Sequence, residues 1–471
     1  MILGDIADGV TRGVESTVKT VSEAFFEPVI RLGVTGLSRA GKTVFITSLA
    51  ANLLNRGRMP ALRAAADGRI ETVWLQPQPD NTVPRFRFED HLATMTGHGA
   101  VWPESTSGIS ELRLSFRVRP NGLLAGLQGP NTVHLDIVDY PGEWLLDLAL
   151  LDLTYRAWSD GVLSQFGDRS EMADYTTLLG GTDGSSRLDE PQAQALAHTY
   201  TEALAALRQA GLSNCTPGRF LMPGDLKGSP VLTFAPLPGG PAPRGSLARE
   251  FERRFEAYKR EVVRPFFREH FARIDRQVVL VDMLGAIHAG PAAVEDMRQS
   301  LADILATFRP GRNDFLRSIF LGKRVERILF AATKADHLHH TQHPQLTAIA
   351  EAVLRDARDR ADFAGATTEA MSIASLRTTT EDQIEQDGRT LDVVRGSLLA
   401  TQKRVAMYPG RLPDDPAHLL NPARAGSETW LDAEYSIEGF APQELTLKPG
   451  DGPPHIRLDR AAEFLIGDRL R

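Results

Sequence analysis

The feature that most constrains the fold is a glycine-rich loop between an apolar segment and a helical one. Residues 36–43 read G-L-S-R-A-G-K-T, which fits the pattern G-x-x-x-x-G-K-[ST] at every fixed position. The residues before it, 29–35, read V-I-R-L-G-V-T and predict a buried strand, and 44–54 carries apolar residues at helical spacing. Strand, glycine loop and helix in this order predict a phosphate-binding loop.

The residue types in this loop suit a polyphosphate. Glycines let backbone N–H groups turn inward around an anion, and the N-terminus of the following helix adds partial positive charge. Lys42 would reach the β- and γ-phosphates, and the Thr43 hydroxyl would ligate Mg²⁺. The alternative is an ordinary glycine turn before a helix. The expected nucleotide-binding residues here are Gly36, Ser38, Arg39, Ala40, Gly41, Lys42, Thr43 and Val44.

Composition narrows the class of protein. The chain has 471 residues, enough for two or three domains, and its 42% hydrophobic and 24% charged residues are typical of a soluble globular protein. The net charge of −7 gives no overall basic surface for nucleic acid. The single cysteine, Cys215, excludes an internal disulfide and a cysteine-based zinc site. These features predict a cytoplasmic protein that does not bind nucleic acid.

The N-terminal segment 1–28 has apolar residues at helical spacing and predicts an amphipathic helix. Asp5, Asp8 and Glu15 interrupt it, so it lacks the apolar core of a signal peptide. No stretch of the sequence is long and apolar enough for a membrane span. We expect the helix to pack on the body of the protein. The alternative is peripheral contact with the inner membrane, although the polar face is mixed in charge.

Strand patterns alternate with helical ones along the chain. Residues 111–119 alternate polar and apolar, as a half-exposed strand does, and 132–138 is a second candidate. Residues 276–284 and 325–333 are continuous apolar runs, as buried parallel strands are, and a short run follows at 369–374. This order predicts an α/β fold: a P-loop NTPase with a three-layer, mostly parallel sheet and ligands at the carboxyl ends of the strands.

A second motif, D-Y-P-G at 139–142, directly follows one expected strand. D-x-x-G in that position is the usual second anchor of a GTPase. Asp139 would hold the Mg²⁺ shell through water, and the Gly142 N–H would sense the γ-phosphate. The tetrapeptide alone is weak, because any strand-to-turn junction can carry it. Its place after the phosphate-binding loop favours the functional interpretation.

A third motif, T-K-A-D at 333–336, fits the guanine-reading pattern [NT]-K-x-D. The Asp336 carboxylate would accept hydrogen bonds from guanine N1–H and the N2 amine, a pair that adenine does not offer. The stem of Lys334 would lie against the base, and Thr333 stands where Asn is usual. The alternative is a strand-ending turn with solvated charges.

Two further elements are expected from position in the chain. Residues 373–376 could close over the base through the backbone N–H groups of Ala374, Ser375 and Leu376. The Mg²⁺-binding threonine of the first switch should lie between the glycine loop and Asp139. Thr106 is the favoured candidate, and Thr82 and Thr94 compete with it.

The helical stretch between the two halves of the sheet is too long for a connection, so we expect an inserted, mainly helical domain. The expected division is an N-terminal helix at 1–28, the first part of the G domain at 29–150, the insertion at 151–270, the second part of the G domain at 271–400, and a C-terminal extension packed on it at 401–471.

The longer phrases of the chain resemble the bacterial YcjX-like family of TRAFAC-class GTPases. The resemblance rests on G-L-S-R-A-G-K-T-V-F-I-T-S-L at 36–49, D-Y-P-G-E-W-L-L-D-L at 139–148, P-G-R-F at 217–220, D-R-Q-V-V-L-V-D at 275–282, A-A-T-K-A-D-H at 331–337 and P-H-I-R-L-D at 454–459. It implies a P-loop core related to Era-like GTPases, an extra helical domain, binding of GTP and GDP with Mg²⁺, and a role in bacterial stress responses.

The residues that would carry hydrolysis are Lys42, Thr106, Glu143 and Arg39. Glu143 occupies the slot in which many GTPases place a water-orienting Gln, but a carboxylate there would be repelled by the γ-phosphate. The alternative is that Glu143 faces solvent or pairs with an arginine. Arg39 could supply positive charge between the β- and γ-phosphates, or it could point to solvent.

Three functions compete. The leading one is a GTPase switch that signals to a protein partner through the helical insertion. The second is a nucleotide-regulated scaffold with negligible hydrolysis, which Glu143 favours, and the third is an ATPase. A histidine group (His337, His339, His340 and His343) has no regular metal-ligand spacing, so exposed loop residues are expected. Asp282 could contact a neighbouring loop near the nucleotide or cap a helix.

Overall fold

The computed structural model describes residues 27–36, 40–104, 108–121, 130–212, 215–306, 325–355, 358–359, 365–386, 388–427, 429–430 and 435–471. Almost all of the predicted N-terminal helix lies outside these residues, as do the predicted site residues Ser38, Arg39 and Thr106. Within the described part of the chain, no helix has the length and apolar character needed to cross a membrane.

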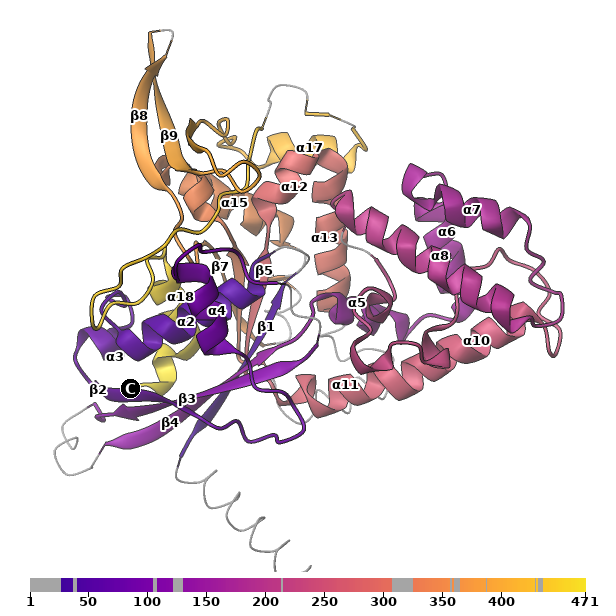
Figure 1. The fold of residues 1–471 in the computed structure, drawn as a ribbon, viewed down its shortest axis with the longest axis horizontal. Helices are drawn as coiled ribbons and strands as arrows, with labels where there is room; N and C mark the ends of the chain where they lie inside the picture. The colour runs from indigo at the N-terminus through magenta and orange to yellow at the C-terminus, as the bar shows by residue number, and fades with distance from the viewer. Residues whose placement is uncertain are drawn as a thin grey trace, which may run out of the picture.

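A seven-stranded mixed sheet forms the centre of the molecule, in the order β2-β3-β4-β1-β5-β6-β7 (Figure 1). Its strands are β1 (Val29–Gly36), β2 (Ile70–Gln76), β3 (Ser110–Val118), β4 (Asn131–Asp139), β5 (Arg276–Val281), β6 (Arg327–Ala332) and β7 (Thr367–Ser372). Strands β4, β1, β5, β6 and β7 pair in parallel, whereas β2 and β3 are joined antiparallel at one edge. The predicted α/β class is confirmed.

Helices cover both faces of this sheet and make it the middle of three layers. In β5 every residue is buried, and the side chains alternate between two hydrophobic cores. Val278 and Leu280 belong to the core beneath α2 (Lys42–Asn55) and α18 (Leu458–Ile466). Val279 and Val281 belong to the core shared with the helices of the other face. This two-sided burial explains why the strand is a continuous apolar run.

Helices α3 (Arg63–Ala66) and α4 (Phe88–Thr96) lie on the same side as α2. The helices of the other face are α5 (Glu143–Leu150), α12 (Met283–Ala289), α13 (Pro291–Ala306), α15 (His343–Val353) and α17 (Ala417–Arg424). Helix α5 directly follows the D-Y-P-G motif and packs against α13.

Residues 151–270 are mainly helical and extend to one side of the sheet (Figure 1). Their helices are α6 (Tyr155–Phe166), α7 (Ala173–Gly180), α8 (Glu190–Gln209), α9 (Gly218–Leu221), α10 (Leu247–Tyr258) and α11 (Arg264–Glu269), with a π-helical turn at Lys259–Val263. Thr154 caps α6 by accepting a hydrogen bond from the Ala157 N–H (3.1 Å), and this cap separates α6 from α5.

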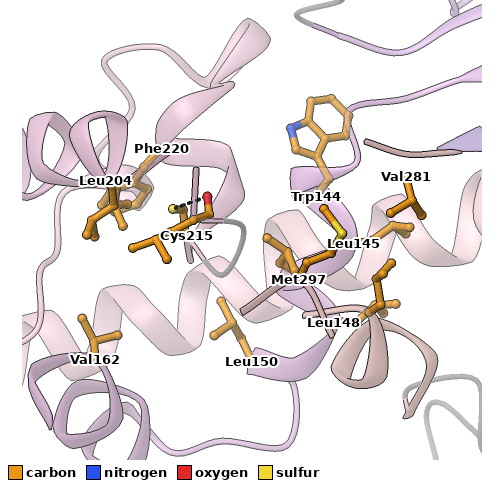
Figure 2. Close-up of a cluster of buried hydrophobic side chains, with 14 of the residues drawn as sticks. Trp144, Leu145, Leu148, Leu150, Val162, Leu204, Cys215, Phe220, Val281 and Met297 are labelled. Carbon is orange, nitrogen blue, oxygen red and sulfur yellow. Dashed lines mark hydrogen bonds between the residues drawn. The ribbon is translucent and has the colours of Figure 1, made fainter. Parts of the chain in front are cut away.

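The insertion and the sheet share one hydrophobic core. Figure 2 draws part of it: Leu145 and Leu148 of α5 belong to the same buried cluster as Met297 of α13 and as Cys215 and Phe220 of the insertion. Because α5 contributes to this shared core, a displacement of α5 would change the packing of both the sheet and the insertion.

The C-terminal part adds a three-stranded antiparallel sheet, a strap and helix α18. The strands are β8 (Thr380–Gln386), β9 (Arg389–Ser397) and β10 (Arg404–Met407), in the order β10-β9-β8. The strap, residues 450–457, follows α2: the Gly57 N–H donates to the Gly450 oxygen (2.9 Å), and Asn52 Nδ2 donates to the Pro453 oxygen (3.1 Å). This extension therefore packs on the core sheet and its first helix.

Candidate nucleotide-binding site

The glycine loop joins β1 to α2 as predicted. Gly41 stands at the helix N-terminus with φ +80° and ψ +35°, a left-handed conformation that favours glycine. Gly36 is needed for a different reason, because an added Cβ would lie 2.9 Å from the Leu280 side chain on the neighbouring strand. Lys42 Nζ donates a hydrogen bond to the Gly36 oxygen (3.3 Å), so the lysine folds back over its own loop.

The D-Y-P-G turn lies directly against the glycine loop. Strands β4 and β1 are neighbours, and Asp139 is paired in register with Val34. A Cβ on Gly142 would lie 2.0 Å from the Gly36 oxygen, so only glycine permits this approach. Asp139 and Thr43 are both buried, at 1% and 6% exposure. Two oxygen ligands on adjacent elements beside a phosphate-binding loop fit the needs of Mg²⁺.

At the other end of the site, T-K-A-D follows β6. The Thr333 N–H donates to the Val281 oxygen (2.9 Å), which holds the turn against β5. Lys334 has φ +62° and its ammonium pairs with the Asp282 carboxylate. Asp282 also accepts from the Gly285 N–H (3.0 Å) and caps α12. Both roles considered for Asp282 from the sequence are therefore present.

Asp336 is buried and its orientation is fixed by the closing loop. Its Oδ2 accepts hydrogen bonds from the Thr378 N–H and hydroxyl, both at 2.8 Å. The Ala335 N–H donates to the Ile373 oxygen (3.0 Å). The two base-reading segments predicted from the sequence are therefore hydrogen-bonded to each other.

One cavity of about 330 Å³ joins these segments. Of the predicted site residues, it is lined by Ala40, Gly41, Lys42, Thr43, Val44, Glu143, Thr333, Lys334, Ala374, Ser375 and Leu376. Gly36, Asp139, Gly142 and Asp336 are not among the lining residues. The glycine loop, the T-K-A-D turn and the segment 374–376 therefore line one cavity.

Glu143 pairs with an arginine of the insertion, which was the alternative considered for it. It is buried, and Arg208 Nη2 of α8 lies 2.7 Å from its Oε1. Both side chains line the cavity. In this arrangement the guanidinium holds the carboxylate at the wall of the cavity.

Several further side chains and backbone groups of the insertion contact α5. Asp147 accepts hydrogen bonds from the Gly218 N–H (2.8 Å) and the Tyr258 hydroxyl (2.5 Å). Burial raises the pKa of Asp147 to about 6, although these hydrogen bonds oppose the shift. The Arg219 guanidinium lies 3.2 Å from the centre of the Trp144 ring, a cation–π contact. The P-G-R-F phrase at 217–220 is therefore a clamp on the helix that follows D-Y-P-G.

Sequence reasoning missed several lining residues. Trp102 donates from Nε1 to the Phe440 oxygen (2.8 Å), and the Phe440 ring packs edge-on against His337 with centroids 5.1 Å apart. Phe440 comes from the C-terminal extension, and no local pattern connects so distant a segment to the site. Arg208 was also not predicted, because in the sequence it is one of the charged residues of an amphipathic helix.

The expectation of exposed loop histidines is wrong for three of the four. His337, His339 and His343 are buried, and only the His340 side chain is well exposed, at 64%. Burial lowers the pKa of His337 and favours its neutral form. The short helical turns that follow T-K-A-D fold these side chains inward, which the spacing of the histidines did not indicate.

The fold and this site define a P-loop protein of the α/β class. The chain belongs to the YcjX-like family, DUF463, whose profile matches residues 30–470. It is 38% identical over 460 residues to "Ras-like GTPase YcjX" of Escherichia coli (strain K12), covering 94% of this chain and 96% of that protein. It is 34% identical over 468 residues to the protein of the same name from Shewanella oneidensis, covering 94% of each. The resemblance drawn from the sequence is confirmed.

Proposed function

We propose that the protein binds GTP and GDP with Mg²⁺, hydrolyses GTP slowly and acts as a nucleotide-dependent switch. The observation that carries this proposal is the single cavity with a phosphate-binding loop at one end and the T-K-A-D turn at the other. The printed names of the two relatives, Ras-like GTPases, support it. A role in bacterial stress, a cytoplasmic location and peripheral membrane contact remain expectations from the sequence.

At the phosphate end, we assign Lys42 to the β- and γ-phosphates and Thr43 and Asp139 to Mg²⁺. When bound, the ion would neutralise charge on the β- and γ-phosphate oxygens. The Lys42 ammonium would exchange its hydrogen bond with the Gly36 oxygen for phosphate oxygens. Ser38, Arg39 and Thr106 keep their proposed roles from the sequence, and no described contact bears on them.

At the base end, Asp336 would distinguish guanine from adenine. Thr378 fixes one carboxylate oxygen of Asp336 through two hydrogen bonds, which orients the group before a base binds. A preoriented carboxylate rejects a base that lacks matching donors, because a buried acceptor would then be left unpaired.

The variant Asp336→Asn tests the guanine assignment. An amide in place of the carboxylate presents a donor where guanine also presents a donor, so GDP affinity should fall at least about tenfold. Xanthosine diphosphate carries a carbonyl at the same ring position and should bind the variant better than GDP does. Unchanged GDP affinity in Asp336→Asn would remove this role from Asp336 and favour the ATPase alternative.

The scaffold alternative is supported by one contact. Because Arg208 holds Glu143, the slot next to Gly142 contains no free group for orienting water in the described structure. Phosphate release from GTP by the full chain with Mg²⁺ separates the two functions. Turnover above the uncatalysed rate that is lost in Lys42→Ala supports the switch, and normal GTP binding without turnover supports the scaffold.

We further propose that the insertion, 151–270, transmits the nucleotide state to a protein partner. Its P-G-R-F clamp and Arg208 contact the helix that begins at Glu143, directly after the glycine expected to sense the γ-phosphate. A shift of that helix on GTP binding would therefore reach the insertion by direct contact. The domain division drawn from the sequence stands as part of this proposal.

A further inference from the structure

A second cavity, separate from the nucleotide site, collects three metal-ligand side chains. Asp80 lies in the loop after β2, Glu111 lies on β3, and His270 follows α11 where the insertion returns to the sheet. Their ligand atoms all lie within 4.8 Å of one another, and the cavity that they line has a volume of about 360 Å³. This cavity and the nucleotide cavity share no lining residue.

Within this cluster, Glu111 has a buried carboxylate with no hydrogen-bond or ion-pair partner among the described residues. The residue is 9% exposed. A buried carboxylate without a donor is costly, and a bound cation removes that cost.

Asp80 and His270 each have a ligand atom that makes no hydrogen bond among the described residues. Asp80 Oδ1 accepts from the Thr82 N–H (2.9 Å) and hydroxyl (2.6 Å), which orients the carboxylate and leaves Oδ2 for a ligand. His270 supplies an imidazole, a side chain that binds divalent transition metals through a ring nitrogen. The ring nitrogens of His270 make no hydrogen bond among the described residues.

Two arginines near this cavity pair with Asp136 and not with Asp80 or Glu111. Asp136, which also lines the cavity, is already held by Arg113 through two hydrogen bonds of 2.6 and 2.8 Å. Arg31 Nε lies 3.9 Å from the same carboxylate. The remaining charged lining residues are Glu269 and Arg273. Because Glu269 Oε1 lies 3.1 Å from Arg268 Nη2, Asp80 and Glu111 are the carboxylates left for a cation.

We propose that Asp80, Glu111 and His270 form a binding site for a divalent transition-metal ion. One imidazole and two carboxylates are a ligand set for Zn²⁺, Mn²⁺ or Fe²⁺, whereas Mg²⁺ and Ca²⁺ take oxygen ligands alone. The site is structural: the ion would tie the end of the insertion at His270 to β3 of the sheet. It does not depend on the identity of the nucleotide.

A second histidine cluster provides the control. His339, His340 and Glu381 also come within 4.8 Å of one another, but His340 Nδ1 and Glu381 Oε2 already form a 2.7 Å hydrogen bond. His340 is exposed, so His340→Ala removes a potential ligand there with little effect on folding. If Zn²⁺ binds at that cluster, the binding should be lost in His340→Ala and retained in Glu111→Gln and His270→Ala.

The test uses the full chain with GDP and Mg²⁺ present, so that the nucleotide site is occupied. ZnCl₂ and MnCl₂ are titrated by calorimetry, and Co²⁺ is followed by its visible d–d absorption. We expect about one equivalent of Zn²⁺, weakened about tenfold or more in Glu111→Gln and His270→Ala and unchanged in His340→Ala. Zn²⁺ should also raise the Tm of the parent protein and not that of Glu111→Gln.

The circular dichroism spectrum and the Tm without added metal report the folding of each variant, and the near-isosteric Glu111→Gln decides the outcome if His270→Ala does not fold. A parent protein that binds no Zn²⁺ or Co²⁺ would overturn the proposal. So would binding that survives Glu111→Gln unchanged or that disappears in His340→Ala. None of these results depends on GTP hydrolysis, so they are separate from a failure of the proposed GTPase function.

Discussion

At the scale of single residues, the site depends on close approaches that only glycine allows. Gly142 lies so near the glycine loop that a Cβ would stand 2.0 Å from the Gly36 oxygen. The glycine of D-x-x-G is therefore required here for close packing, in addition to the N–H that it would offer to the γ-phosphate. Gly142 can therefore shift toward the glycine loop only if the backbone of that loop also moves.

We predict that Gly142→Ala weakens GTP binding more than GDP binding, because the added methyl displaces the turn from the position expected for the γ-phosphate. Gly161→Ala is the matched control. Gly161 is inside α6 with open space around it, so alanine should increase stability by up to ~1 kcal/mol through helix propensity. Equal GTP affinity in parent and Gly142→Ala, measured by calorimetry, would refute the packing argument.

The Glu143–Arg208 pair gives a second prediction at this scale. Arg208→Ala leaves a buried carboxylate without its guanidinium, so the free energy of unfolding should fall by about 3 kcal/mol. Adding Glu143→Gln should restore much of that loss, because the charge is then gone. Urea unfolding of the two single variants and the double variant measures the coupling. Strictly additive effects would mean that the pair does not hold the two elements together.

At the scale of elements, α5 depends on the protonation of Asp147. The folded pKa of about 6 lies above the ordinary value of about 3.9, so the folded state binds the proton more tightly. The stability from this group is fully present below about pH 4 and is lost as the pH rises through 6. The loss should be on the order of 3 kcal/mol, since each pKa unit corresponds to about 1.4 kcal/mol.

Comparison with Asp147→Asn isolates this effect. The difference in unfolding free energy between parent and variant should change across pH 4 to 7 in favour of the variant, as measured by urea titration. Tyr258 and Arg219, which face the carboxyl, do not titrate in this window and remain in both proteins. A difference that is constant with pH would contradict the raised pKa.

The strap and the closing loop form a second element-scale unit. The Ile456 N–H donates to the Ala374 oxygen (2.8 Å), and the Ala374 N–H donates to the Ile456 oxygen (3.1 Å). We predict that Ile456→Pro, which removes the first donor, weakens GDP binding about tenfold. Ile456→Ala keeps both backbone hydrogen bonds and serves as the control. If both variants bind GDP equally, the strap does not order the closing loop.

The sequence predicted those elements whose pattern is local. The run at 276–284 is buried on both faces of the sheet, so its composition alone identifies β5. Strands β8 and β9 were missed because their residues are largely polar and half exposed, which gives no alternation to detect. Segments that approach the site from distant parts of the chain, such as Phe440 and Arg208, had no local signal at all.

At the scale of the whole molecule, the nucleotide cavity lies where three parts of the chain meet. The G-domain motifs supply its two ends, the insertion contributes Arg208, and the C-terminal extension contributes Phe440. One hydrophobic core joins the sheet to the insertion through α5. We propose that this organisation lets a bound guanine nucleotide act on the insertion through direct contacts with α5.

We propose that this cavity binds a guanine nucleotide through its diphosphate and its base. The decisive measurement is calorimetric titration of GDP and of ADP into the full chain with Mg²⁺. We expect one GDP per chain, bound at least about a hundredfold more tightly than ADP because Asp336 pairs only with guanine. Binding of ADP as tight as that of GDP, or no binding of either nucleotide, would contradict it.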